Sequence, residues 1–108
     1  PPVQDTPPPL PPDRRITVAA LWKRATMQEL ITLDLASIDN PSATLQQRQF
    51  AAGIRVWKSI VQASDAFDLD DTSNRAGIMA LVGYNVLASD ARALEILDTP
   101  VSDAERPA

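Results

Sequence analysis

The clearest hydrophobic pattern in the sequence runs through residues 42–67. Four apolar side chains recur there at i, i+4, i+7 and i+11, namely Phe50, Ile54, Trp57 and Val61. This spacing places them on one face of an α-helix, and polar residues occupy most of the other positions. The pattern predicts a long amphipathic helix opened by Ser42 or Thr44. We expect the neighbouring segments to fold back on its apolar face.

Shorter helices are predicted on both sides of this long helix, each after residues that can cap a helix N-terminus. They are 18–24 after Thr17, 27 to about 37 with a Thr26–Glu29 capping box, 75 to about 85 after Asp70, Asp71 or Thr72, and 91–97 after Ser89-Asp90. No segment alternates apolar and polar residues convincingly enough to predict a strand. The sequence therefore predicts an all-α fold, a small bundle of about five helices.

Residues 1–12 have a different composition, because seven of the twelve are proline. Proline fixes φ and lacks a backbone donor, so this segment is expected to be an extended polyproline II arm. Residues 9–14, PLPPDR, match the P-x-x-P-x-basic pattern that SH3 domains bind, while the commoner explanation is a spacer or a strap along a neighbour. We predict three parts: a proline-rich arm at 1–15, a helical domain at 16–99 and a loose C-terminal tail at 100–108.

The charge of the chain argues against nucleic acid as a partner. The net charge is −4, whereas a nucleic-acid binder carries a concentrated basic patch. The long helix does have a basic stripe, Arg48, Arg55 and Lys58, but such a stripe is more commonly solvated or paired with carboxylates from elsewhere in the fold. No apolar run approaches the ~20 residues of a membrane span, and no signal-peptide pattern is present, so we also expect no membrane contact.

Catalytic and metal-binding chemistry has few candidates in this sequence. There is no cysteine and no histidine, which removes thiolate chemistry and the commonest general base and metal ligand. Residues 68–74 space their oxygen atoms like the start of a calcium loop, but Ser73 and Met79 stand where glycine and a bidentate glutamate are needed. Capping of the next helix is the better explanation. We therefore predict no enzyme activity, no cofactor and no metal site.

The three glycines form no phosphate-binding motif. Gly53 lies inside the long helix, where glycine costs on the order of 1 kcal/mol relative to alanine. The glycine therefore predicts that another backbone approaches closely at this position. The alternative is that the fold simply tolerates it.

Residues 66–97 resemble a pattern found in small proteins encoded in the tail modules of tailed bacteriophages. The matching motifs are a V-D-L-D-D-type turn at 67–71, a G-h-x-x-L-V helix at 77–82, a G-L-L-T/S turn at 86–89 and a closing R-A-x-x-I-L at 92–97. Residues 16–30 also resemble the opening helix, turn and second helix of those proteins. The chain departs from the pattern at Tyr84-Asn85, where a glycine is expected, and in the proline-rich arm.

The resemblance implies a non-enzymatic structural or adaptor protein of the phage tail or baseplate, present in the virion in several copies and made in the host cytoplasm. Its partners would be other virion structural proteins, bound through the arm and through apolar side chains left over from a small core. The predicted interaction residues are Pro7, Pro8, Pro9, Leu10, Pro11, Pro12, Trp22, Val56 and Tyr84. The alternative is a soluble regulatory or chaperone-type module that binds proteins through the acidic turn at 65–71 or through the arm.

Overall fold

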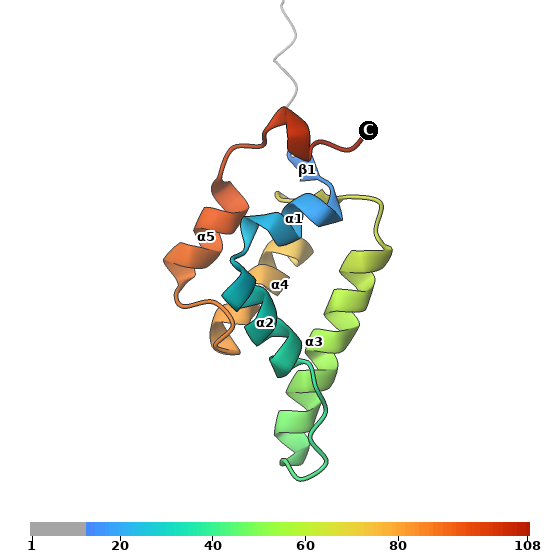
Figure 1. Cartoon of the computed structure of the whole chain (residues 1–108), viewed down its shortest axis with the longest axis vertical. Helices are drawn as coiled ribbons and strands as arrows, with labels where there is room; N and C mark the ends of the chain where they lie inside the picture. Colours follow the sequence, from blue (N-terminus) through green and yellow to red (C-terminus); the bar gives the residue numbers. More distant parts are fainter. Residues whose placement is uncertain (1–12) are drawn as a thin grey trace, which may run out of the picture.

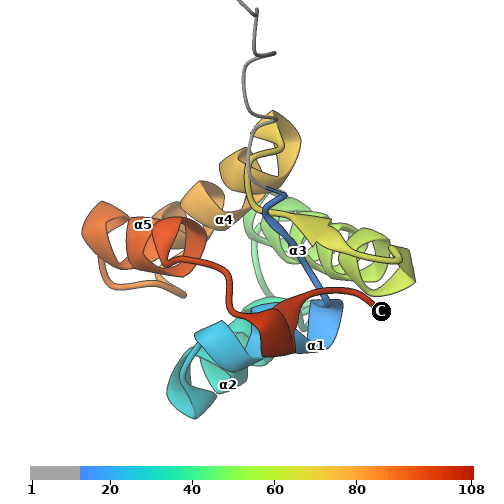
Figure 2. The ribbon, with the colours of Figure 1, turned by 90° about the horizontal axis from the view of Figure 1, so that it is seen from above.

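Helix α3 (Leu45–Ala63) forms one long side of the molecule, and the other elements lie beside it (Figure 1). The computed structural model describes residues 13–108. Seen from above, the α1–α2 pair, α3 and the α4–α5 pair lie around a common centre (Figure 2). The predicted interaction residues of the arm lie outside the described part of the chain; these are Pro7, Pro8, Pro9, Leu10, Pro11 and Pro12.

Side-chain caps begin every α-helix of residues 13–108. The five helices are α1 (Val18–Arg24), α2 (Met27–Ala36), α3 (Leu45–Ala63), α4 (Thr72–Gly83) and α5 (Asp90–Asp98). Their caps are Thr17, Thr26, Thr44, Asp71 and Ser89, each accepting a hydrogen bond from a backbone N–H of the first turn. The predicted all-α class with about five helices is confirmed. Only α4 begins clearly earlier than predicted, because the Asp71 carboxylate accepts from Asn74 N at 2.9 Å.

A short two-stranded sheet corrects the prediction that the chain has no strand. Strand β1 (Arg15–Ile16) pairs antiparallel with β2 (Phe67–Asp68), with Ile16 opposite Phe67. These two apolar side chains are fully buried. A two-residue strand is too short to show alternation, so the pattern could not reveal it. Arg15, the last residue of the predicted arm, therefore belongs to the folded domain.

The C-terminal segment is bound to the domain, so the prediction of a loose tail was wrong. A 3₁₀ helix, η1 (Asp103–Glu105), lies beside the start of α1. Thr17 N donates to Glu105 O at 2.8 Å, and the Glu105 carboxylate lies 2.7 Å from Arg24 Nε. Arg106 Nη1 donates to Asp13 O at 2.9 Å. The two ends of the described chain are thus held together at one end of the molecule.

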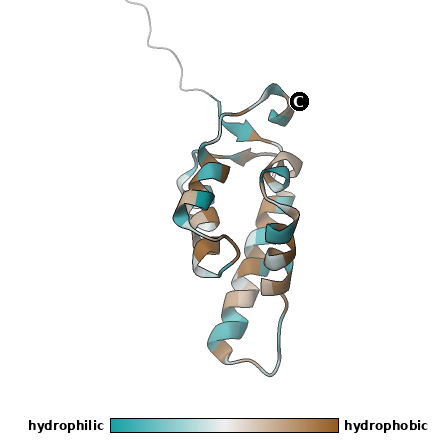
Figure 3. Cartoon of the chain, turned by 60° about the vertical axis from the view of Figure 1, so that its left-hand side comes forward, coloured by the Kyte–Doolittle hydropathy of each residue, from teal (hydrophilic) through white to brown (hydrophobic). Residues whose placement is uncertain are grey.

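The core lies between α3 and the shorter helices. Along each helix, hydrophobic residues recur between hydrophilic ones (Figure 3). On the predicted apolar face of α3, Ile54 and Val61 are buried and Trp57 is half-buried, but Phe50 is 45% exposed. The reason is that the first turns of α3 project beyond the other helices; all of residues 45–50 are exposed. The prediction for this face is therefore confirmed only for its C-terminal part.

Close packing at a glycine occurs in α4 rather than in α3. No atom lies within 4 Å of where a Cβ would stand at Gly53, so the predicted backbone approach there is wrong. At Gly77, in contrast, a Cβ would stand 3.0 Å from Trp57 Cε2 and still closer to Trp57 Nε1. Trp57 also meets Trp22 edge to face, with ring centroids 6.2 Å apart. Gly77 therefore makes room for the indole that joins α3 to α1 and α4.

Candidate protein-interaction surface

Helix α2 and the turn after it carry a row of exposed apolar side chains, which we call the α2 face. Met27, Ile31 and Leu35 lie on the helix at i, i+4 and i+8, and Ile38 follows just beyond the C-cap residue Ser37. Their exposed fractions are 72%, 46%, 63% and 56%. On the opposite side of the same helix, Leu33 is buried in the core. Helix α2 is therefore apolar on two sides, although only one side is covered.

The N-terminal end of α2 is held in place by a bidentate ion pair with α5. Thr26 and Glu29 form the predicted capping box, with Thr26 N donating to Glu29 Oε1 at 2.8 Å. Arg92 then donates from Nε to Glu29 Oε2 at 2.9 Å and from Nη2 to Oε1 at 2.7 Å. These hydrogen bonds from Arg92, together with the one from Thr26 N, lower the pKa of Glu29 from 4.5 to about 2. The carboxylate therefore stays ionised and paired at neutral pH.

The far end of α2 is held by the basic stripe of α3. Arg48 makes a bidentate pair with Asp39, with both nitrogen–oxygen distances at 2.9 Å. Arg55 Nη1 donates to the backbone oxygen of Ser37 at 2.8 Å. Lys58 Nζ lies 3.4 Å from Asp34 Oδ1.

A solvated face, or pairing with carboxylates from elsewhere in the fold, was the commoner explanation for the basic stripe. Pairing with carboxylates is confirmed for Arg48 and Lys58, whereas Arg55 donates to a backbone oxygen. Exposed pairs of this kind contribute at most about 1 kcal/mol each to stability. Their main effect is to fix how α2 lies against α3. Since both ends of α2 are tied, the α2 face is presented on a rigid element.

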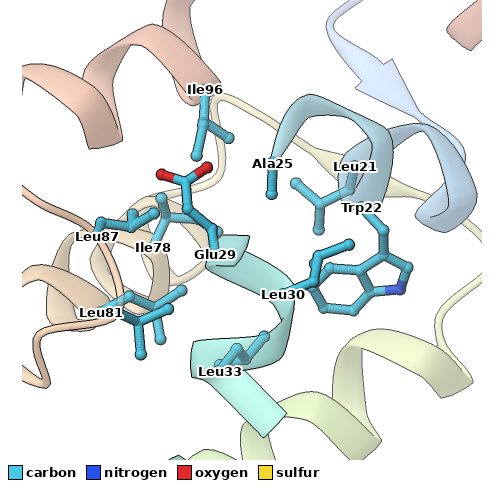
Figure 4. A pocket seen from close by; sticks show the side chains of 11 residues that line it. Leu21, Trp22, Ala25, Glu29, Leu30, Leu33, Ile78, Leu81, Leu87 and Ile96 are labelled. Atoms are coloured by element: carbon cyan, nitrogen blue, oxygen red, sulfur yellow. The ribbon is translucent and has the colours of Figure 1, made fainter. Parts of the chain in front are cut away.

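A small, partly open cavity lies between α1, α2, α4 and α5 (Figure 4). Its volume is about 20 Å³, close to the space of a single water molecule. Ten side chains that surround it are labelled in Figure 4, nine of them apolar, and Glu29 is the one charged residue among them. The cavity is too small for an organic ligand.

A larger, open groove lies between the N-terminal half of α3 and the end of α4, and we call it the aromatic groove. Its volume is about 650 Å³, and it is lined by Ala36, Gln47, Phe50, Ala51, Ile54, Ala80, Gly83, Tyr84 and Asn85. The Phe50 and Tyr84 rings are in contact, with centroids 5.5 Å apart and planes tilted by 58°. Asn85 adopts φ 62°, a left-handed conformation that asparagine tolerates, and it follows the end of α4. The groove is thus open and mostly apolar, and Gln47 and Asn85 are the amide residues that line it.

The predicted interaction residues of the helical domain do not form one surface. Trp22 is half-buried against the core and touches Trp57. Val56 is 57% exposed on α3, close to exposed Ile60. Tyr84 lines the aromatic groove.

Sequence reasoning missed the α2 face as an interaction surface, although the signal was present. The apolar residues of α2 occupy more than one face, and one small domain cannot bury both. A helix that is apolar around its circumference is normally buried. Counting the apolar faces of each short helix would have pointed to this surface.

Three carboxylates of the acidic turn, those of Asp68, Asp70 and Asp71, make contacts inside the fold. Asp71 caps α4, and the Asp68 carboxylate accepts from Asp70 N at 2.9 Å. Asp70 also lies 2.6 Å from Arg14 Nη1. Within residues 13–108, no group of three or more acidic side chains is arranged to hold a metal ion. No helix of this described part is long and apolar enough to cross a membrane.

Comparisons with protein-family models, curated proteins and solved structures gave no match. The likeness to phage tail-module proteins therefore rests on the motifs in residues 16–30 and 66–97 alone.

Proposed function

We propose that this chain is a non-enzymatic protein-binding adaptor that docks through the α2 face onto an apolar surface of a neighbouring protein. The observation that carries the proposal is the row of four large apolar side chains that are roughly half to three-quarters exposed. Large contiguous exposed apolar patches are uncommon on soluble monomers and mark interaction sites. Covering these four side chains would contribute on the order of 5 kcal/mol.

The rigid support of α2 favours docking of a preformed surface. The Glu29–Arg92 and Asp39–Arg48 pairs hold the two ends of the helix, so little ordering is needed when a partner binds. A surface that is already in its bound shape loses less conformational entropy on association. Because the side chains of the α2 face are uncharged, the partner needs no charged group opposite them.

The proposed setting is the tail or baseplate of a bacteriophage particle, where the partners are other virion structural proteins and the chain is present in several copies. This setting is supported by the motif resemblance. A structural role also fits the composition, since the chain has no cysteine and no histidine to serve as a nucleophile or general base. A regulatory module that acts outside the particle is the alternative that the experiment must separate.

The experiment compares two matched substitutions in purified phage particles by mass spectrometry. Leu35→Lys places a charge on the α2 face, and Ile60→Lys places one at an equally exposed position of α3, since the two side chains are 63% and 62% exposed. We expect wild-type and Ile60→Lys protein in particles and loss of Leu35→Lys, with unchanged circular dichroism for both. If wild-type protein is absent from particles, the virion setting is refuted. If Ile60→Lys is the variant that is lost, docking uses α3 and the α2 face is not the site.

A further inference from the structure

The aromatic groove has the chemistry of a site for proline-rich peptide. The contacting rings of Phe50 and Tyr84 line it, together with the small residues Ala51, Ala80 and Gly83. Its volume, about 650 Å³, lies within the usual range of ligand sites. Phe50 is 45% exposed, so part of its ring is free to contact a ligand.

Polyproline II segments fit such grooves for two physical reasons. The helix makes no internal hydrogen bonds, so its carbonyl oxygens are free to accept from side-chain donors. The amide groups of Gln47 and Asn85 at the groove can supply these donors. Proline rings also pack against aromatic faces, and the peptide loses little conformational freedom because it is already extended.

The sequence contains one segment of this chemistry, residues 7–12, PPPLPP. We propose that the aromatic groove of one copy binds the Pro7–Pro12 segment of a second copy. The proposal adds a second, separate contact to the adaptor function and does not depend on the α2 face.

The distance from Asp13 to the groove favours binding of a segment from a second copy over binding of the chain's own segment. The segment joins the domain at Asp13, which lies at the β1 end of the molecule, opposite the α2–α3 connection (Figure 1). Asp13 O accepts from Arg106, and the neighbouring Arg14 pairs with Asp70, so this junction is fixed. Phe50 lies 13 residues before the end of α3 at Ala63, which is roughly 20 Å along the helix axis. Six residues of polyproline II span about 19 Å. Because Pro12 is joined directly to Asp13, a segment of that length could bring only its far end to the groove, and it could not lie along the groove as a whole.

An arm of one copy in the groove of the next is a head-to-tail contact. Such a contact uses two different surfaces of the same protein, so it continues from copy to copy until a ring closes or a filament forms. The proposed partner is thus the same chain, and the expected product is an assembly larger than a dimer at high concentration.

The test is a complementation experiment with full-length chains in analytical ultracentrifugation. Phe50→Ala removes an exposed ring from the groove, and Leu10→Asp disrupts the segment. We expect each variant alone to associate at least about tenfold more weakly than wild type, the size expected from losing a central aromatic contact. An equimolar mixture should form a heterodimer that stops at two chains, because one partner keeps its groove and the other its segment. Ile60→Ala, at an exposed position of α3 outside the groove, is the control and should associate like wild type.

A site-specific signal comes from Tyr84, the single tyrosine of the chain. In Leu10→Asp protein labelled with fluorotyrosine, we expect the ¹⁹F resonance to shift when a synthetic peptide of residues 1–12 is added, and not with a Leu10→Asp peptide. A mixture of variants that stays monomeric, or an unmoved resonance, overturns the proposal. A resonance that differs between wild type and Leu10→Asp at every concentration would show binding within one chain and overturns it as well. Loss of association in Leu35→Lys alone would leave the groove unused and locate the contact on the α2 face.

Discussion

Replacing Gly77 by alanine tests how tightly α4 packs against α3. The ideal alanine Cβ would stand 3.0 Å from Trp57 Cε2 and 3.1 Å from Trp57 Cδ1. Gly53 is the matched control, because it also lies inside an α-helix but has no atom within 4 Å of the added carbon. Each substitution gains about 1 kcal/mol from the higher helix propensity of alanine. The two variants therefore differ mainly in packing.

The penalty at Gly77 arises because the Trp57 indole has little freedom to move away. Its ring lies edge to face with Trp22, with centroids 6.2 Å apart, and both side chains pack against the core. Adding a methyl group to such a site typically costs about 1–3 kcal/mol. We expect Gly53→Ala to raise the free energy of unfolding by about 1 kcal/mol. Gly77→Ala should lie about 1–3 kcal/mol below Gly53→Ala.

Urea unfolding followed by far-ultraviolet circular dichroism measures both free energies on the same scale. In thermal melts, the difference should appear as a gap of at least about 4 °C between the two melting temperatures. A Trp57→Phe background, which removes part of the indole, should abolish most of the Gly77→Ala penalty in a double-mutant cycle. If Gly77→Ala stabilises the protein as much as Gly53→Ala does, the indole moves freely and the packing argument is refuted.

Two further predictions concern ion pairs. Because pairing lowers the pKa of Glu29 from 4.5 to about 2, its contribution is full above pH 4.5 and disappears as the pH falls toward 2. The loss is about 3 kcal/mol at most, and urea unfolding between pH 6 and 2 should show it in wild type but not in Glu29→Gln. Equal slopes in both proteins would contradict this. Glu105→Ala should lower stability by about 2 kcal/mol, because the nearly buried Arg24 loses a charged partner. A calorimetric melt in which it matches Asp103→Ala, an exposed neighbour, would show that the C-terminal pair is dispensable.

The helix starts could be predicted because capping is a local rule. Thr26 and Glu29 are three residues apart in sequence, and the hydrogen bonds that they make involve only the first turn of α2. The same holds for Thr44 and Gln47 at the start of α3. Spacing alone is enough to identify such contacts, since no other part of the chain takes part.

Contacts between distant residues could not be predicted in this way. Arg24 and Glu105 are separated by 81 positions, and nothing in the composition of residues 100–108 shows that they pair. Ile16 and Phe67 meet in strands of two residues, too short for any periodicity. The pairing partners of the basic stripe were foreseen as a class, whereas their identities depended on how α2 lies against α3.

The α2 face could have been predicted from the sequence, whereas the aromatic groove could not. Ile31 and Leu35 could be recognised as apolar residues off the core side of α2, although the prediction did not use them as contacts. The aromatic groove depends on Phe50 and Tyr84 meeting across two helices, and this arrangement follows only from the tertiary fold. Tyr84 was predicted as an interaction residue without its neighbour.

The contact between the two ends of the described chain has a mechanical consequence. Arg106 holds Asp13, the backbone of Glu105 accepts from Thr17, and the Glu105 carboxylate pairs with Arg24 of α1, so tension applied between the arm and the C-terminal segment acts first on these few bonds. Helices α2, α3 and α4 bear no load until these bonds break. The protein would yield first by releasing η1, which lengthens the tether while the core and the α2 face keep their shape. In an assembly under strain, release of η1 allows two attached neighbours to move apart by the length of the few residues that are freed, while the domain between them stays folded.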